Sequence, residues 1–187
     1  EINIDGTPAT NKTPSQAIKA GNGLCPEDRK KQRLVLGRSV RDNLTIPILD
    51  AISRNGIIDR KKERRLSGEA IDKYRIKTHS MEKIARELSG GNQQKIILGR
   101  WMLADLKVLI LDEPTKGIDV GAKAEIYQMV CDLAREGLGV IFISSELQEV
   151  INVYDKVIVM KEGVITGRLN REEMSEEGIL ALAMQEN

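Results

Sequence analysis

One apolar run that ends in two acids constrains the fold of this chain more than any other feature. Residues 108–111 are all apolar and are followed at once by Asp112 and Glu113. A second short apolar run covers residues 139–143. Runs of this length that are rich in β-branched residues are typical of strands covered on both faces of a parallel sheet. We therefore expect an α/β fold with both runs in a parallel sheet.

The residues around these runs predict further elements of the same fold. Between the runs, apolar residues recur at helical spacing: Ile126, Met129, Val130 and Leu133. Gly137 stands just past the expected end of this helix. Residues 156–160 and 164–166 predict two strands joined by a tight turn at 161–163. Residues 171–184 predict a final amphipathic helix.

The chain has 187 residues, 41% hydrophobic and 30% charged, which fits one globular domain. We expect three parts within it. Residues 1–38 are expected to form an antiparallel strand-and-turn part that carries a lid loop, and residues 39–88 a polar, mostly helical part. Residues 89–187 are expected to form the α/β part. In the middle part, Ser39 is a plausible helix N-cap, Pro47 would end or kink that helix, and Asn55-Gly56 is a turn signal.

Charge and cysteine content exclude some classes of function. Lys and Arg total 29 against 28 Asp and Glu, a formal net charge of +1, so no basic footprint predicts nucleic-acid binding. The basic cluster at 60–65 is interpreted as a solvated helix face. Cys25 and Cys131 are expected to be free thiols in a reducing compartment. His79 is expected at the surface, with no second histidine to share a metal.

No apolar run approaches the roughly 18 residues that a membrane-spanning helix needs. If the protein works at a membrane, we expect it to do so as a peripheral partner.

The two acids after the first run predict a catalytic site at the carboxyl edge of the sheet. The carboxyl ends of parallel strands are where such sheets bind ligands. Asp112 is expected to hold Mg²⁺, directly or through water, and Glu113 to orient and deprotonate an attacking water. The alternative is a pair of surface acids that start a turn before Pro114.

A second motif, Leu-Ser-Gly-Gly-Asn-Gln-Gln-Lys, covers residues 88–95. Ser89 can cap the helix that follows, and Gly90 and Gly91 carry no side chain that would keep an anion from the backbone N–H groups. Together with the positive end of the helix dipole, this predicts a site for a terminal phosphate. The alternative is an ordinary serine-capped helix after a glycine hinge.

In this order, the motifs resemble those of ATP-binding-cassette proteins. Residues 88–91 are similar to the signature motif, residues 111–115 to the Walker B segment, and residues 117–120 to the D-loop. The resemblance implies a P-loop NTPase-like cassette with a mostly parallel sheet core, and it makes residues 39–88 the helical subdomain. It also implies ATP and Mg²⁺ as cofactors.

Finer features resemble one subfamily. These are residues 92–95 after the signature, residues 25–30 in place of the usual glutamine lid, and residues 119–123 and 144–147. They look like the second, C-terminal cassette of the fused two-cassette ATPases that drive bacterial import of ribose, xylose, arabinose and galactosides. Autoinducer-2 importers share this architecture. The implied partners are a first cassette, an integral-membrane sugar permease and, indirectly, a periplasmic sugar-binding protein. The implied location is cytoplasmic, on the inner face of the cell membrane.

The resemblance also implies roles for individual residues. Each nucleotide in this family lies between the phosphate loop of one cassette and the signature of the other. The implied nucleotide-binding residues are Ser89, Gly90, Gly91, Asn92, Gln93, Glu27 and Asp119. The implied magnesium ligands are Asp112 and Glu27, and the implied catalytic residues are Glu113 and Ser145.

The sequence departs from the family pattern at three places. No Gly-x-x-x-x-Gly-Lys-Ser/Thr phosphate loop occurs, and the first residue is Glu1. We expect truncation before the phosphate loop, in preference to its natural loss, and therefore a chain that is inactive and marginally stable alone. Ser145 stands where a switch histidine usually contacts the γ-phosphate, and Glu27 replaces a neutral glutamine.

Two other functions remain open from the sequence. One is a non-hydrolysing regulatory cassette, or an inert fragment, that completes a partner's ATP site. The other is a soluble cassette protein of DNA repair or translation. Near-neutral charge and the residues at 92–95 and 27–30 argue against the second of these.

Overall fold

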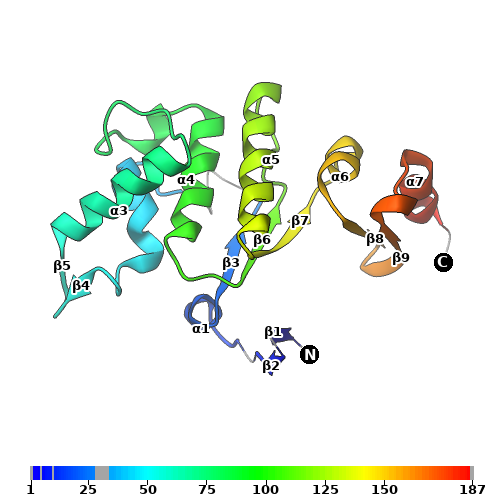
Figure 1. Ribbon diagram of the computed structural model, residues 1–187, viewed down its shortest axis with the longest axis horizontal. Coiled ribbons are helices and arrows are strands. Elements are labelled where there is room, and N and C mark those ends of the chain that lie inside the picture. The colour runs from blue at the N-terminus through cyan, green and yellow to red at the C-terminus, as the bar shows by residue number, and fades with distance from the viewer. Residues whose placement is uncertain (1, 5, 10, 28–33, 186–187) are drawn as a thin grey trace. The chain divides into compact units, whose positions relative to one another are not determined.

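The computed structural model describes residues 2–4, 6–9, 11–27 and 34–185, and Figure 1 shows the order of their elements. The chain divides into two compact units, Glu1–Ile143 and Ser144–Asn187. This boundary was not indicated by the sequence. Each unit is described by itself. In the part of the chain that the structure describes, no helix is both long enough and apolar enough to cross a membrane.

The first unit contains the predicted parallel sheet. Its strand order is β3 (Asn22–Cys25), β6 (Val108–Asp112) and β7 (Gly139–Ile143). Both strand pairs are parallel, with Leu109 opposite Gly23 on one side and Val140 on the other. Both apolar runs are therefore strands, and the prediction of a parallel sheet is confirmed. The expectation of antiparallel pairing throughout residues 1–38 is wrong for β3, which pairs parallel with β6.

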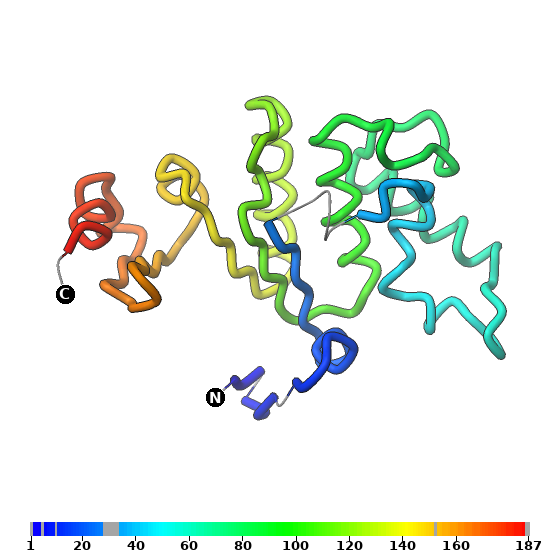
Figure 2. Tube along the Cα trace, turned by 180° about the vertical axis from the view of Figure 1, so that it is seen from behind, coloured from blue at the N-terminus to red at the C-terminus, as the bar shows by residue number. Residues whose placement is uncertain are grey.

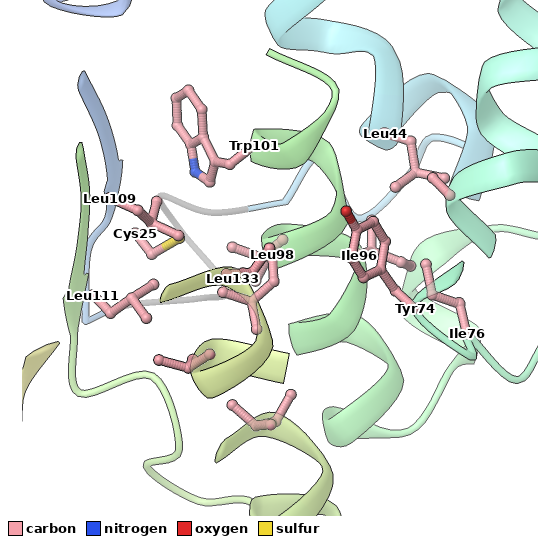
Figure 3. Close-up of a cluster of buried hydrophobic side chains, with 14 of the residues drawn as sticks. Cys25, Leu44, Tyr74, Ile76, Ile96, Leu98, Trp101, Leu109, Leu111 and Leu133 are labelled. Atoms are coloured by element: carbon pink, nitrogen blue, oxygen red, sulfur yellow. The ribbon is translucent and has the colours of Figure 1, made fainter. Parts of the chain in front are cut away.

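Two helices, α4 (Gly90–Met102) and α5 (Val120–Arg135), pack against this sheet through one shared core. Figure 3 shows Leu109 and Leu111 of β6 turned toward the side chains of these helices. Cys25 is fully buried in the same cluster, and neither cysteine forms a disulfide, as expected. Helix α5 ends before Gly137, whose φ of 98° suits glycine, so the predicted helix stop is confirmed.

The expectation that both faces of the strands are covered is wrong for the described residues. Leu24 is 51% exposed and Ile141 is 52% exposed. The cause is the alternation of side chains along a strand, which sends every second residue to the face opposite α4 and α5. Among the described residues, therefore, only one face of the sheet is buried.

The segment before β3 contains more than the expected strands and turns. A short hairpin of β1 (Asn3–Ile4) and β2 (Thr7–Pro8) is followed by helix α1 (Pro14–Lys19). Helix α1 was missed, although its start carries a recognisable signal. The Thr13 hydroxyl accepts a hydrogen bond from the Gln16 N–H at 3.3 Å, and Pro14 occupies the first turn, where proline is tolerated.

The middle part begins with helix α2 (Val40–Thr45). The Ser39 hydroxyl accepts a hydrogen bond from the Asp42 N–H at 3.0 Å, which confirms Ser39 as the N-cap. The α-helix ends at Thr45, and a 3₁₀ turn, η2 (Ile46–Ile48), carries Pro47 in its first positions. Pro47 therefore lies where the helix ends, as predicted.

A small hairpin and a long helix follow. The hairpin joins β4 (Ser53–Arg54) to β5 (Ile57–Ile58). Its turn residues, Asn55 and Gly56, both have positive φ, at 52° and 77°, which confirms the turn signal. Helix α3 (Arg60–Lys73) comes next.

The basic cluster at 60–65 is a solvated face only in part. Arg60, Arg64 and Arg65 have exposed side chains. Glu63 is 1% exposed and pairs with Arg60 at 2.8 Å and with Arg41 at 3.5 Å. The exception follows from helical geometry, because Glu63 lies on the side of α3 that packs toward α2.

The second unit is built around a β-hairpin. Strands β8 (Lys156–Lys161) and β9 (Val164–Asn170) pair antiparallel across a turn at Glu162-Gly163, as predicted. Helix α7 (Glu176–Met184) lies beside this hairpin in both views (Figures 1 and 2). Its Ile179 packs against Val157 and Val159. Helix α6 (Leu147–Val153) precedes the hairpin and contributes to the same core.

The final helix begins at Glu176 and not at Arg171. Residues Arg171–Glu173 form a separate 3₁₀ turn, η4, closed by a capping box between Asn170 and Glu173. The Ser175 hydroxyl then accepts a hydrogen bond from the Gly178 N–H at 3.0 Å and caps α7. Two successive caps divide what the sequence pattern presents as one helix.

We predict that two leucines of the sheet differ sharply in their effect on stability. Leu109 is fully buried against α4 and α5, so Leu109→Ala is expected to lower the free energy of unfolding by about 2–5 kcal/mol. Leu24 lies on the neighbouring strand and is half exposed, so Leu24→Ala is expected to cost about 1 kcal/mol or less. Urea unfolding measures the stability of both variants. Equal losses of unfolding free energy would contradict the burial of only one face of the sheet.

Candidate functional site

The motif at 88–91 lies where helix α4 begins. Ser89 occupies the N-cap position, with φ −60° and ψ 156°, as predicted. Its side chain makes no cap hydrogen bond to a backbone N–H. Instead, the Ser89 Oγ accepts a hydrogen bond from Asn92 Nδ2 at 2.9 Å. The expected position of Ser89 is therefore correct. The expected capping bond is wrong, because the Ser89 hydroxyl accepts from the Asn92 side chain and not from a backbone N–H.

Both amide side chains that follow the glycines shape the start of this helix. Asn92 Oδ1 accepts a hydrogen bond from the Lys77 N–H at 2.8 Å, so Asn92 links Ser89 to the loop after α3. Gln93 Nε2 donates to the carbonyls of Ala85 and Leu88, at 3.2 and 3.0 Å. Those carbonyls belong to the 3₁₀ turn η3 (Ala85–Glu87) and its C-cap. The predicted nucleotide contacts of Asn92 and Gln93 stay predictions.

Gly91 has a packing role that the sequence did not reveal. A Cβ atom added at Gly91 would lie 2.6 Å from the Cβ of Ala122 on α5, far inside van der Waals contact. Helices α4 and α5 therefore touch at a point where only glycine fits on α4. This requirement stands beside the predicted contact between the Gly91 backbone and an anion.

The residues resembling a D-loop lie at the start of α5. Asp119 Oδ1 accepts a hydrogen bond from the Ala122 N–H at 2.9 Å and caps the helix. A cavity of about 310 Å³ lies between this helix start and that of α4. We call it the signature cavity, and its lining residues are Lys77, Ser89, Gly91, Asn92, Lys95, Asp119, Gly121, Ala122 and Glu125. The structure thus brings four predicted site residues, Ser89, Gly91, Asn92 and Asp119, into one cavity.

Two ion pairs at this cavity were missed by the sequence analysis. Lys95 has a side chain only 3% exposed, and its Nζ lies 2.5 Å from Glu125 Oε2. It also donates to the Arg75 carbonyl at 3.0 Å. Lys77 Nζ lies 3.7 Å from the other oxygen of Glu125. The sequence did contain a signal: Lys95 is followed directly by three apolar residues, and a lysine on a buried helix needs a partner of opposite charge.

The pKa of Glu125 is lowered, first by its hydrogen bond with Lys95, then by the charge of Lys95 and, less, by Lys77. A lowered pKa means that the carboxylate form is favoured in the folded state. The ion pairs are therefore present at neutral pH and are lost only as the pH falls through this lowered pKa.

Asp112, the predicted magnesium ligand, and Glu113, the predicted catalytic base, lie at the carboxyl end of β6, as expected. Asp112 is the last residue of the strand. Glu113 has φ 46°, in the left-handed region that few residues other than glycine adopt. Its N–H donates to the Ile143 carbonyl at 2.9 Å and so continues the sheet by one hydrogen bond. Backbone strain of this kind gathers at functional sites, so it agrees with a functional Glu113.

Glu27 joins this edge through Lys116. Lys116 Nζ lies 2.5 Å from Glu27 Oε1. The pKa of Lys116 is raised, first by its hydrogen bond with Glu27 and also by the charges of Glu113 and Asp112. The carboxylates of Glu27, Asp112 and Glu113 therefore act on one ammonium group. Lys116 was missed by the sequence analysis, and the lid residues 28–30 lie outside the described residues.

These carboxylates fit a magnesium ion that is also bound by a nucleotide better than one that is bound by protein side chains alone. Among the described residues, no three His, Cys, Asp or Glu gather to hold a metal by themselves. Mg²⁺ is commonly held by one or two carboxylates together with substrate phosphates and waters. Asp112 and Glu27 supply that number of carboxylates, so the donor set fits an ion that a nucleotide also holds.

Ser145 belongs to the second unit. It is exposed and lies between β7 and α6. The neighbouring Ser144 Oγ donates to Glu149 Oε2 at 2.7 Å and accepts from the Glu146 N–H at 3.0 Å. Glu149 is 4% exposed, so a buried carboxylate fixes the loop that carries Ser145. The catalytic role expected for Ser145 stays a prediction.

Comparison with known proteins gives close sequence relatives. Residues 1–116 match the family described as "ABC transporter". The arabinose import ATP-binding protein AraG of Vibrio parahaemolyticus is 46% identical over 188 residues, covering 100% of this chain and 37% of the relative. The ribose import ATP-binding protein RbsA of Bacillus licheniformis is 45% identical over 183 residues, covering 98% of this chain and 37% of the relative. The chain thus spans little more than a third of the length of these relatives.

Solved structures are similar as well. A nucleotide-free ATP-binding cassette from an ABC transporter has a TM-score of 0.75 at 20% identity, covering 95% of this chain and 74% of that one. The structure of cbiO1 from Clostridium perfringens, part of the transporter complex cbiONQ, has a TM-score of 0.71 at 26% identity. That likeness covers 90% of this chain and 65% of the other.

We predict that the helix contact at Gly91 can be broken and repaired. Gly91→Ala is expected to lower the free energy of unfolding by about 1–3 kcal/mol, because the added methyl group overlaps Ala122. Adding Ala122→Gly removes the overlapping atom. In urea unfolding, the double variant is expected to be more stable than Gly91→Ala alone, although Ala122→Gly by itself costs about 1 kcal/mol. Simple additivity of the two losses would contradict the contact.

Proposed function

Because the chain belongs to the ABC transporter family of ATP-binding-cassette ATPases, we propose that it forms part of the ATPase of a bacterial carbohydrate importer. Its fold is the P-loop NTPase-like cassette fold, with helices and a parallel sheet core, as predicted. The proposal of sugar import is supported by the relatives, which are named as arabinose and ribose import ATP-binding proteins.

The proposed place of the chain is the second cassette of a fused two-cassette ATPase. The observation that supports its role most directly is the signature cavity, where Ser89, Gly91 and Asp119 meet at the starts of two helices. Backbone N–H groups at a helix start favour a phosphate group. We assign Ser89, Gly90, Gly91, Asn92, Gln93 and Asp119 to the ATP whose phosphate loop belongs to the first cassette.

The carboxyl end of β6 is proposed to serve a second ATP. Asp112 and Glu27 would hold Mg²⁺, which when bound neutralises charge on the phosphates. Glu113 would accept a proton from the attacking water, because its carboxylate stands at the strand end beside these acids. Ser145 would donate a hydrogen bond to the γ-phosphate. A serine hydroxyl lacks the imidazole ring of a switch histidine, so we propose that this second site turns over slowly.

The partners follow from the proposed import function. They are a first cassette, an integral-membrane sugar permease and, indirectly, a periplasmic sugar-binding protein. The ATPase would act as a peripheral protein on the cytoplasmic face of the cell membrane. The transported sugar would be selected by the permease and the periplasmic binding protein.

A second candidate function is a cassette that binds without hydrolysing and completes its partner's site. Two observations favour it over a symmetric ATPase. Ser145 stands where the family pattern has a switch histidine, and Glu27 forms an ion pair with Lys116. The two candidates differ in whether Glu113 contributes to turnover.

We predict that Ser89→Arg in the complete ATPase lowers ATP turnover more than Glu113→Gln does. The arginine side chain would fill the signature cavity and block the faster site, with an expected loss of tenfold or more, or about 1.4 kcal/mol of transition-state stabilisation. Glu113→Gln would remove the base of the slower site only. Steady-state phosphate release measures both variants. Full activity in Ser89→Arg together with none in Glu113→Gln would reverse the assignment of the two sites.

We predict that the 187-residue chain alone does not bind Mg-ATP, because no phosphate-loop motif occurs in its sequence. Isothermal titration measures this directly. The matched comparison is a longer form of the protein that includes a phosphate loop upstream. Binding by the short chain would mean that other residues hold the phosphates and that the proposed site is wrong.

A further inference from the structure

We propose that Glu125 is a positioning residue for the signature cavity, acting through its ion pairs with Lys95 of helix α4 and Lys77 of the loop before it. This inference rests on the proposed role of that cavity in ATP turnover. Glu125 belongs to none of the three family motifs. It lies on α5, after the residues that resemble a D-loop. It supplies a link between the segments that form the cavity.

The first part of the argument is the position of Lys95. Its side chain is 3% exposed, and its ammonium group lies against Glu125 Oε2 and the Arg75 carbonyl. A buried ammonium group needs a partner with opposite charge, because burial removes its hydration. Glu125 is the carboxylate in the described structure that pairs with it. Helix α4 is therefore held to α5 by charge, one turn beyond the contact of Gly91 with Ala122.

The second part is the loop before the signature. Arg75 has φ 50°, so the chain turns sharply where its carbonyl meets Lys95. Two residues later, the Lys77 N–H donates to Asn92 Oδ1, and Asn92 Nδ2 donates to Ser89 Oγ. Lys77 Nζ also pairs with Glu125 at 3.7 Å. Glu125 is thus linked to Ser89 through Lys77 and Asn92. Its ion pair with Lys95 holds the same loop two residues earlier, at the Arg75 carbonyl.

The expected consequence is an effect on turnover and not on nucleotide capture. Under the proposed function, the phosphate loop of the first cassette binds the nucleotide, and the signature contacts the γ-phosphate after the cassettes close. A displaced Ser89 would then lower kcat, while the KM for ATP would stay nearly unchanged. A residue that only stabilises the fold would lower the amount of folded enzyme without changing how each folded enzyme turns over.

The experiment uses the complete ATPase and a matched pair of variants. Glu125→Gln keeps the size of the side chain and removes the charge. Glu136→Gln makes the same change at the C-cap of the same helix, where Glu136 pairs with Lys73 at 3.0 Å outside the signature cavity. The active fraction, kcat, KM and thermal midpoint are measured for both, together with Glu125→Asp and Ser89→Arg.

We expect Glu125→Gln to lower kcat about tenfold with a KM within about twofold of the parent, a change that corresponds to partial loss of transition-state contacts. Glu125→Asp, which keeps the charge, is expected to recover part of kcat, and Glu136→Gln to turn over as the parent does. If Glu125→Gln retains the parent kcat while Ser89→Arg is inactive, the inference is wrong and the proposed function stands. If kcat per folded enzyme falls equally in Glu125→Gln and Glu136→Gln, the effect is not specific to the signature cavity, which also overturns the inference. If Ser89→Arg keeps full turnover, the proposed function itself fails.

Discussion

The burial of helix α4 is the constraint on which the rest of the first unit depends. Its residues from Gln94 to Trp101 are all buried. Figure 3 shows one side of α4 facing Leu109 and Cys25 of the sheet, and the other side facing Leu44, Tyr74 and Ile76 of the helical part. Gly99 makes the second contact possible, because a Cβ there would lie 3.1 Å from the Tyr74 ring. One helix therefore serves as core for both parts.

The placement of α4 explains how the signature cavity arises. A helix buried along most of its length cannot shift without disturbing two packed surfaces, so its first turn is held in a fixed position. Gly91 then brings α5 close, and Lys95 adds a charged contact with Glu125 farther along. Asp119 closes the start of α5. The exposed Ser89 is thus supported by residues that are themselves buried or hydrogen-bonded.

Much of this fold could be predicted from local patterns. The apolar runs at 108–111 and 139–143, the cap at Ser39 and the stop at Gly137 each depend on neighbours in sequence, and each is confirmed. Helix α1 was missed because six residues give too little periodicity to exceed the turn signals around them. The exposed face of Leu24 was also missed, because burial depends on which elements pack against a strand.

In the candidate site, too, local sequence patterns identified some residues and missed those whose contacts depend on packing. The motif residues could be found because their order along the chain is specific, and the structure brings Ser89, Gly91, Asn92 and Asp119 together. Their supporting contacts could not be found in this way. Lys95 meets Glu125 across two helices, and Lys116 meets Glu27 from a distant strand end. Nothing in sequence spacing specifies such pairs, because only the packing of α4, α5 and the sheet decides which charges approach each other.

The chain connection between the two functional edges has a mechanical consequence. Strand β6 ends at Asp112, the segment from Glu113 to Asp119 follows, and α5 begins at Val120. The start of this segment is tied to β7 by the Glu113 N–H, and its end is tied to α5 by Asp119. Helix α5 in turn contacts α4 at Gly91. A displacement of the acids is therefore transmitted through short, hydrogen-bonded chain to the signature, because close-packed elements move together and not independently. Under the proposed function these edges serve different ATP molecules, so this segment would couple the two sites within one cassette.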